Sequence, residues 1–314
     1  MKLVPDFIDF VKKDFNWKAY TYAAVLLVVL LFLNQHYNWY YTYLNPTYWE
    51  GTSMLWYTVF YLSVYFIAAI PFLLIKKDYK VLKNPWFYLK STFFIMLFGL
   101  TIGFYSYYDY EFVGLTSTEG AYIKHLLFYL KTTFMPLPFL ILAKLTFDKR
   151  LENLYGISAS HQHVSTYLLC LLALVPFVIA ASYTAEFQSM YPLFKPWYYH
   201  GAFDMSDAEL ALINSMAYCF HYVGTEWVFR GCLVVGMAAI VGRSAVVPMA
   251  VMYCAIHFGK PIGEAISSIF GGYILGSLAY QTRHIWGGIV IHIGIALVMD
   301  FAGLFQHYCT SSNR

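Results

Sequence analysis

The residues best suited to chemistry lie in a stretch of the chain that is otherwise apolar. Glu226 and Arg230 stand four residues apart in Gly-Thr-Glu-Trp-Val-Phe-Arg-Gly, inside an apolar segment from Ala208 to Ile240. On an α-helix this spacing puts the acid and the base on one face. Charged groups at membrane depth are costly unless they face a protein interior or a water-filled cavity, so the pair predicts a functional site.

Two histidines belong to later apolar segments. His257 ends the segment from Ala245 to Phe258, and His292 lies within the segment from Ile285 to Phe305. Counted from the cytoplasmic ends of their segments, Glu226, His257 and His292 lie about 21, 20 and 12 Å deep at the rise of an α-helix. The sequence therefore predicts that three ionisable groups from three spans meet near the middle of the membrane.

Such a set of groups has the chemistry to hydrolyse an amide. A buried carboxylate can act as general base on a water, and imidazoles can donate hydrogen bonds to a developing oxyanion. Two other interpretations stay open. Glu226 and Arg230 could merely neutralise each other, or His221, Glu226, His257 and His292 could hold a divalent metal. His221 and Glu226 differ by about 140° around a helix, which is poor geometry for two ligands.

The composition indicates a membrane protein. Of 314 residues, 60% are hydrophobic and 12% are charged, whereas soluble domains average about 25% charged residues. The formal net charge of +3 is small and dispersed, which argues against a nucleic-acid partner. The cysteines show no CxxC spacing or disulfide framework and are interpreted as small core residues: Cys170, Cys219, Cys232, Cys254 and Cys309.

Apolar stretches long enough to span a bilayer recur along the chain. We expect an all-α polytopic membrane protein with about eight to nine transmembrane helices, given that each span needs roughly 20 residues. The stretches cover residues 20–34, 54–75, 91–107, 126–145, 164–183, 208–240, 245–258, 262–280 and 285–305. The seventh and eighth are short or rich in glycine and could be tilted or re-entrant.

The loops between these stretches predict the orientation of the chain. Lys and Arg gather in alternate loops, in the amino-terminal segment and at residues 76–83, 149–150, 243 and 283, and the other loops are rich in Tyr and Trp. Because basic residues accumulate on the cytoplasmic side, we expect a cytoplasmic amino terminus. The pattern is typical of an integral membrane protein, which we expect in a bacterial inner membrane.

Three regions follow along the chain within one membrane domain. Residues 1–18 form an amphipathic interfacial segment, residues 19–163 the amino-terminal transmembrane helices, and residues 164–314 the catalytic region. The loop before the third region holds His161 and His163, interpreted as a solvated pair and not as metal ligands. Gly271, Gly272 and Gly276 form a small-residue face that predicts close helix packing.

From about Ala208 to Phe305 the order of these groups resembles the CAAX prenyl protease and bacteriocin-processing (CPBP, or Abi) family of intramembrane glutamic endopeptidases. That family carries Glu-Glu-xxx-Arg, then Phe-xxx-His, then His-xxx-Asn. The resemblance implies that the first Glu activates water, that the histidines and the Asn support the oxyanion, and that no metal takes part.

The first motif departs from the family at its leading position. Arg230 matches the Arg of the motif and Glu226 matches the second Glu, whereas Thr225 stands where the first Glu would be. We therefore expect Glu226 to act as the base, with His221 and Thr225 as supporting residues.

The second and third motifs are also partly changed. Tyr253 replaces the Phe, and His257 matches the His of the second motif. His292 matches the first position of the last motif, and Ala296 stands in place of the Asn. Two of the four catalytic positions implied by the resemblance therefore differ in this chain.

The expected function is metal-independent hydrolysis of a peptide bond inside the membrane. The expected catalytic residues are Glu226, Arg230, His257 and His292, with His221, Thr225 and Tyr253 in support, no cofactor and no metal site. The expected partners are a membrane-anchored peptide or protein substrate and the lipid bilayer. The alternative is a catalytically inactive scaffold or an immunity-type partner-binding protein, which the changes at Thr225 and Ala296 favour. A transporter fits less well, because no inverted repeat is visible.

Overall fold

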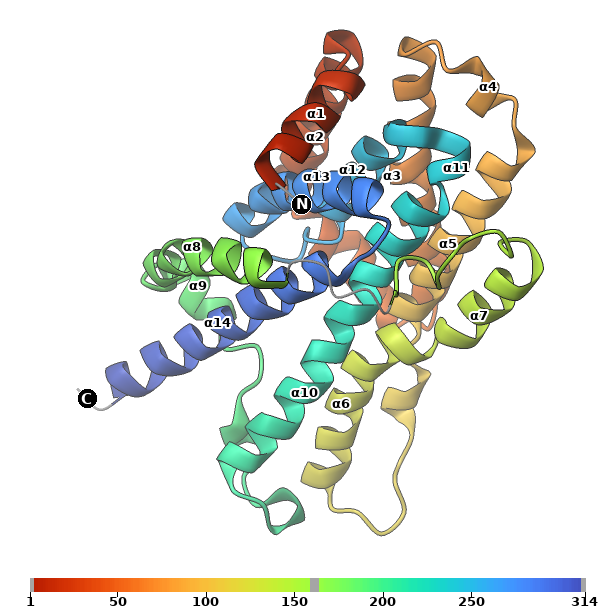
Figure 1. The fold of residues 1–314 in the computed structure, drawn as a ribbon. Helices are drawn as coiled ribbons and strands as arrows, with labels where there is room; N and C mark the ends of the chain where they lie inside the picture. The colour runs from red at the N-terminus through yellow and green to blue at the C-terminus, as the bar shows by residue number, and fades with distance from the viewer. Residues whose placement is uncertain (1–2, 159–163, 312–314) are drawn as a thin grey trace. The chain divides into compact units, whose positions relative to one another are not determined.

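The computed structural model describes residues 3–158 and 164–311, and over these residues the chain is helical and holds no β-strand (Figure 1). In this described part, seven helices are long and apolar enough to cross a membrane. The predicted class, an all-α polytopic membrane protein, is confirmed. The cytoplasmic placement of the amino terminus stays a prediction.

The chain divides into two compact units, each built from separate stretches of sequence. The first unit comprises Met1–Tyr105, Pro136–Gln162 and Glu226–Gly288, and the second comprises Ser106–Met135, His163–Thr225 and Ile289–Arg314. The three regions expected along the sequence stay a prediction, because this division follows packing and not chain order.

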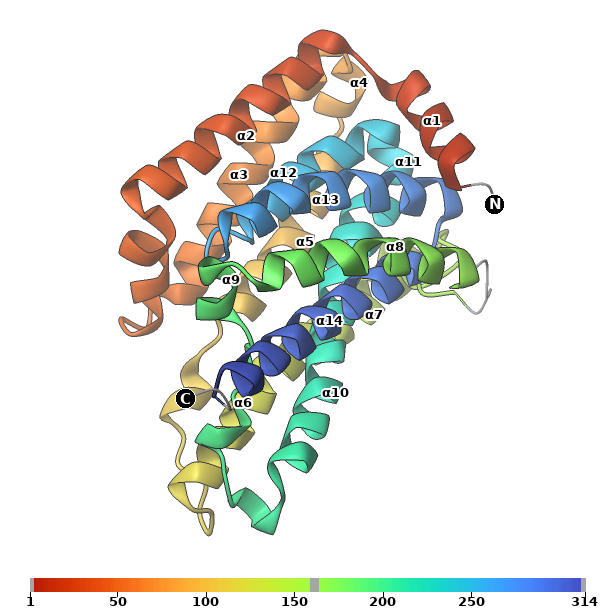
Figure 2. The ribbon, with the colours of Figure 1, turned by 90° about the vertical axis from the view of Figure 1, so that its left-hand side faces the viewer.

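The first unit holds most of the long helices. They are α1 (Leu3–Asp14), α2 (Trp17–Tyr37), α3 (Ser53–Ile75), α4 (Tyr79–Leu82), α5 (Pro85–Gly103), α7 (Leu137–Thr146), α11 (Ala238–Val241), α12 (Val246–Ala255) and α13 (Ile262–Thr282). Two π-helices, η1 (Tyr40–Leu44) and η6 (Trp227–Gly236), two 3-10 helices, η2 (Asn45–Tyr48) and η7 (Gly242–Ala245), and the turn after α12 complete it. Helix α3 packs against α2, α5 and α12, and α12 packs against α13 (Figure 2).

Local sequence explains where several of these helices begin and how closely they pack. The Asn16 side chain accepts a hydrogen bond from the backbone of Ala19 and so caps α2, and Asn84 caps α5 in the same way just before Pro85. A Cβ on Gly272 would lie 3.1 Å from the Tyr253 ring. The small-residue packing predicted for α13 is confirmed at this glycine.

The second unit is built around α6 (Ser117–Phe134), α10 (Asp207–Glu226) and α14 (Trp286–Ser311). It also contains η3 (Ser106–Asp109), α8 (Val164–Ser182), α9 (Ala185–Met190), η4 (Pro196–Tyr198) and η5 (Ala202–Asp204). Tyr129 of α6, Ala217 and Tyr218 of α10, and Ala296 of α14 form one of its buried clusters. The last residue of α10 and the first turn of α14 belong to the first unit.

The number of spans differs from the number of apolar stretches for a geometric reason. The predicted stretches 208–240 and 245–258 form one nearly continuous helical run, Asp207–Ala255. Within it α12 has 10 residues, which rise about 15 Å and fall short of a bilayer crossing. The predicted stretch 164–183 is also helical, but its described apolar part, Tyr167–Ser182, is shorter than a spanning helix.

Helix α1, which covers most of the predicted amphipathic segment, packs against α13 within the first unit. Phe10 of α1 is buried, and its ring lies edge-on to Tyr273 and Tyr280 of α13. At the end of α1, Asp14 forms an ion pair with Lys76 at 2.6 Å. Helix α1 is therefore held to the protein by one face, and its place at the membrane interface stays a prediction.

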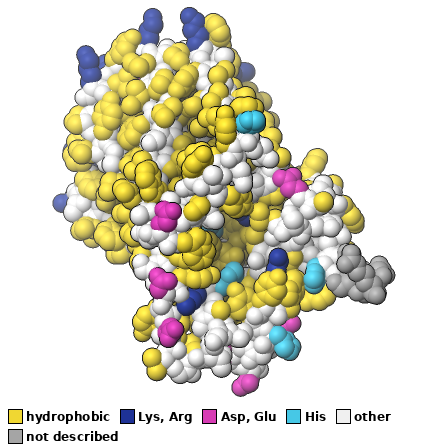
Figure 3. Space-filling view, turned by 180° about the vertical axis from the view of Figure 1, so that it is seen from behind, with side chains coloured by type: hydrophobic (Ala, Val, Ile, Leu, Met, Phe, Trp, Pro, Cys, Tyr) yellow, Lys and Arg dark blue, Asp and Glu magenta, His cyan; other side chains and the backbone are white. Residues whose placement is uncertain are grey.

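Hydrophobic side chains cover much of the upper part of the face shown in Figure 3, and several Lys and Arg side chains lie along its upper edge. Large apolar side chains on α2 are among those exposed, including Val25, Val28 and Phe32. An exposed apolar surface with basic groups at its margin is the surface that a protein in a lipid bilayer needs.

Candidate functional site

The segment after Glu226 is a π-helix and not the regular α-helix that the sequence predicted. All residues of η6 are buried. A π-helix has i→i+5 hydrogen bonds and often marks a functional site. Gly231 and Gly236, five residues apart, both lie against Tyr155: a Cβ on Gly231 would clash with the Tyr155 carbonyl oxygen, and a Cβ on Gly236 would lie 2.9 Å from its ring. The two glycines therefore allow η6 to pack closely against Tyr155.

Glu226 and Arg230 form a fully buried ion pair at the start of this π-helix. Arg230 Nη1 lies 2.8 Å from Glu226 Oε1, and both residues have no exposed surface. The guanidinium carbon lies 4.0 Å from the centre of the Tyr253 ring, a cation–π contact from α12. The spacing that predicted one shared face is confirmed, and Tyr253 joins the pair from a second helix.

Gly288 lies directly against the Glu226 carboxylate. A Cβ on Gly288 would overlap Glu226 Oε2, so the carboxylate packs directly against the first turn of α14. Any side chain larger than hydrogen at this position must displace the carboxylate or the backbone. Sequence reasoning missed Gly288, although the Gly287-Gly288 pair at the start of a helix was visible.

His257 lies in the turn that follows α12. Its Nδ1 is 2.7 Å from the Tyr253 carbonyl oxygen. Because a carbonyl oxygen only accepts hydrogen bonds, Nδ1 carries the proton in this contact. Neutral His257 therefore presents Nε2 as a proton acceptor, and it can donate from Nε2 only after taking a second proton.

Four of the seven expected site residues lie together in the first unit. Glu226 contacts Arg230, Arg230 contacts the Tyr253 ring, and Tyr253 contacts His257 through its carbonyl. These contacts form one continuous chain from the carboxylate to the imidazole. The chain uses four elements: the last residue of α10, the first turn of η6, helix α12 and the turn after it.

The other three expected residues belong to the second unit. Thr225 Oγ1 donates a hydrogen bond to the His221 carbonyl at 3.0 Å, so it bonds to its own helix. His221 Nδ1 lies 3.0 Å from Thr132 Oγ1 of α6. The predicted meeting of His292 with Glu226 and His257 stays a prediction.

His292 is packed against tyrosines of α10. Its ring centre lies 4.1 Å from that of Tyr222, and the Tyr222 hydroxyl donates to the Tyr218 hydroxyl at 2.5 Å. Ala296, one turn further along α14, lies in the buried cluster with Tyr218. The position where the family pattern has Asn is therefore part of an apolar core.

A second buried ion pair holds the far end of η6. Lys90 Nζ of α5 lies 2.6 Å from Asp148 Oδ1 and donates to the Gly236 carbonyl at 2.8 Å, and the Tyr155 hydroxyl donates to Asp148 Oδ2 at 2.8 Å. Carbonyls at a helix end lack partners within the helix, and Lys90 supplies one. Sequence reasoning missed Lys90 because the predicted span began at the next residue, Ser91.

Among residues 3–158 and 164–311, no group of three or more His, Cys, Asp or Glu side chains is placed to hold a metal ion. His161 and His163 lie outside the described residues. Metal independence therefore stays an expectation.

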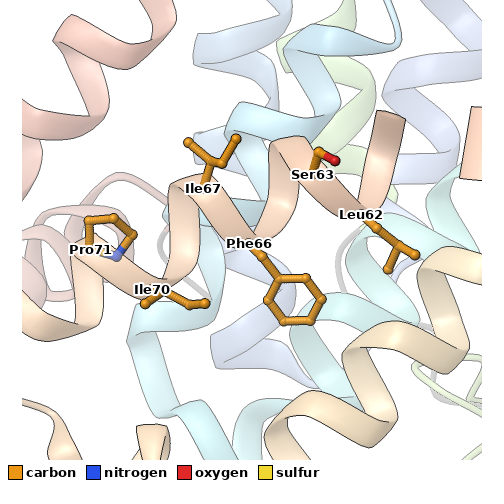
Figure 4. A pocket seen from close by; sticks show the side chains of 6 residues that line it. All are labelled: Leu62, Ser63, Phe66, Ile67, Ile70 and Pro71. Atoms are coloured by element: carbon orange, nitrogen blue, oxygen red, sulfur yellow. The ribbon is translucent and has the colours of Figure 1, made fainter. Parts of the chain in front are cut away.

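The surface hollow that Figure 4 shows is unrelated to these residues. It has a volume of about 450 Å³, and every side chain that lines it comes from α3: Leu62, Ser63, Phe66, Ile67, Ile70 and Pro71. It holds no ionisable group. The chemistry of Glu226 and His257 makes them the better candidate site.

Comparison with known proteins connects this site to one family. Residues 208–298 match the family model described as type II CAAX prenyl endopeptidase Rce1-like. The predicted resemblance to CAAX proteases is confirmed over this stretch, which contains Glu226, Arg230, His257 and His292. No curated protein and no solved structure matches the chain. The helices before residue 208 lie outside the match.

Proposed function

We propose that this protein is an intramembrane endopeptidase that hydrolyses a peptide bond of a membrane-anchored substrate. The observation that carries the proposal is the buried Glu226–Arg230 pair in the matched stretch, linked through Tyr253 to His257. Buried charges in a membrane helix are costly, and such residues usually serve a function.

In the proposed reaction Glu226 takes a proton from water while the water oxygen attacks the scissile carbonyl carbon. Arg230 pairs with the carboxylate at 2.8 Å and fixes its orientation. Nε2 of His257 accepts a hydrogen bond from the same water and directs its lone pair toward the substrate. The C–N bond then breaks as the proton passes from Glu226 to the leaving nitrogen.

The oxyanion formed by this attack needs hydrogen-bond donors. The tautomer of neutral His257 suits proton acceptance. Oxyanion support by His292 is carried into the proposal from the family resemblance. The resemblance implies an Asn as a second donor, and Ala296 cannot replace it. The proposal therefore expects slower turnover than an enzyme that keeps the Asn.

Cleavage of membrane-anchored peptides tests the proposal. The purified protein in liposomes is offered a peptide library with and without prenyl groups, and products are identified by mass spectrometry. The wild type cleaves at least one peptide, and Glu226→Gln does not. Glu264→Gln, which removes a carboxylate near the surface in α13, is the matched control and keeps activity. Equal cleavage by wild type and Glu226→Gln contradicts the assigned base.

A non-catalytic scaffold is the second candidate, and two observations favour it. Glu226 is fully buried, and the Thr225 hydroxyl is bonded to its own helix. In this case Glu226 and Arg230 would stabilise η6, and crosslinking would capture the same membrane partner with wild type and Glu226→Gln.

Metal analysis of the purified protein separates a third case, a metal-dependent site. Stoichiometric metal in the wild type that is lost in His257→Ala would indicate such a site.

A further inference from the structure

Building on the proposed function, we infer that Asn34 and Tyr41 are positioning residues that hold the turn carrying His257. Both belong to the amino-terminal helices outside the matched stretch, in a region where the sequence indicated no chemistry. Both lie in the first unit together with His257.

The turn between α12 and α13 presents backbone carbonyls that need hydrogen-bond partners. Asn34 Nδ2 of α2 donates to the Phe258 carbonyl at 3.1 Å, and the Tyr41 hydroxyl of η1 donates to the Gly259 carbonyl at 2.8 Å. The two carbonyls directly after His257 are thus bound by side chains more than 200 positions earlier in the chain.

Asn34 is held in place by a second hydrogen bond. Its Oδ1 accepts a hydrogen bond from the Tyr40 backbone N–H at 3.2 Å, while its Nδ2 donates to the Phe258 carbonyl. An amide in a membrane helix is costly unless it is hydrogen-bonded. Asn34 therefore uses both ends of its amide to join η1 to the His257 turn.

The ring of Tyr40 closes the other side of the turn. A Cβ on Gly259 would lie 2.6 Å from a carbon of this ring, so the glycine backbone and the ring are in direct contact. The Tyr57 hydroxyl donates to the Tyr40 hydroxyl at 3.2 Å and fixes the ring from α3. Phe258 is buried beside Phe60. The turn is therefore enclosed by hydrogen bonds on one side and by aromatic packing on the other.

These contacts decide where Nε2 of His257 lies. The Tyr253 carbonyl fixes the orientation of the ring, and Asn34 and Tyr41 fix the backbone from which the ring extends. A displacement near 1 Å at a reacting group can cost about 100-fold in rate. We expect Asn34→Ala to lower kcat about 10- to 100-fold and Tyr41→Phe by less, with KM nearly unchanged, because His257 acts in the chemical step.

Steady-state kinetics on the peptide cleaved by the wild type tests this expectation. Asn34→Asp keeps the shape and the acceptor for Tyr40 and loses the donor to Phe258, so it should resemble Asn34→Ala. Gln35→Ala in α2 and Tyr43→Phe in η1 are matched controls, since both side chains are exposed neighbours outside these contacts. A uniform loss in all five variants would indicate a general folding effect and overturn the inference.

Nitrogen-15 NMR of histidine-labelled protein supplies a readout that does not depend on activity. The His257 signal, assigned with His257→Gln, should show the Nδ1–H tautomer in the wild type and both controls. Asn34→Ala should shift it and populate the other tautomer. An unchanged signal and unchanged kcat in Asn34→Ala and Tyr41→Phe overturn the inference even if cleavage is confirmed. A wild type that cleaves nothing overturns the proposed function, and the NMR signal still decides whether Asn34 holds the turn.

Discussion

The matched stretch and the amino-terminal helices contribute different kinds of polar groups to the first unit. In the matched stretch, Glu226 at the end of α10 pairs with Arg230 in the π-helix η6. In the amino-terminal helices, Lys90 and Asn34 donate to backbone carbonyls of the matched stretch, at Gly236 and Phe258. The proposed reacting groups and the groups that hold them therefore come from separate parts of this chain.

The largest expected effect concerns stability and is expected at Lys90, one of the groups that hold the matched stretch. Lys90→Met leaves the buried Asp148 carboxylate without its ion-pair partner and should lower the free energy of unfolding by about 3–5 kcal/mol. Thermal unfolding in detergent measures the change, with exposed Lys83→Met as the control. Adding Asp148→Leu should recover part of the loss. A Lys90→Met protein as stable as the wild type would contradict the holding role.

A smaller effect, on activity, is expected at Gly288. Gly288→Ala introduces a methyl group where Glu226 Oε2 lies, so the carboxylate must move and kcat should fall about 10- to 100-fold. Gly271→Ala is the matched control, because a Cβ there meets no atom within 4 Å. Equal rates for both variants would show that the position of Glu226 does not control cleavage.

The smallest effect is expected at Thr225, the position where the family pattern has its leading Glu. The Thr225 hydroxyl bonds to the His221 carbonyl of its own helix, so Thr225→Val should change kcat/KM by less than about 3-fold, in line with the modest worth of one neutral hydrogen bond. The kinetic assay described for Glu226 measures it. A loss of kcat/KM as large as that of Glu226→Gln would contradict this expectation and indicate a direct role of Thr225 in the reaction.

Periodicity and hydropathy predicted the parts of this protein that depend on local sequence. The apolar stretches are helical, and the four-residue spacing of Glu226 and Arg230 does form an ion pair. The joining of α10, η6 and α12 into one run was not predicted, because hydropathy does not distinguish a tight helical joint from a loop. The π-helix of η6 was not predicted, because a regular repeat of 3.6 residues was assumed throughout this apolar stretch.

The groups that hold the site could not be predicted for a different reason. Asn34 and Phe258 are 224 positions apart, and no local pattern relates them. Lys90 was available to the rule that charges inside spans are functional, but placing the span boundary at Ser91 assigned it to a loop. Contacts distant in sequence depend on tertiary packing, which a single sequence does not reveal.

Cleavage by wild-type protein and by Glu226→Gln in the same liposomes tests the central claim most directly. We expect cleavage of a membrane-anchored peptide by the wild type and by Glu264→Gln. In Glu226→Gln we expect a loss of at least about 100-fold, the lower range for removal of a general base. Cleavage by Glu226→Gln at the wild-type rate would contradict it.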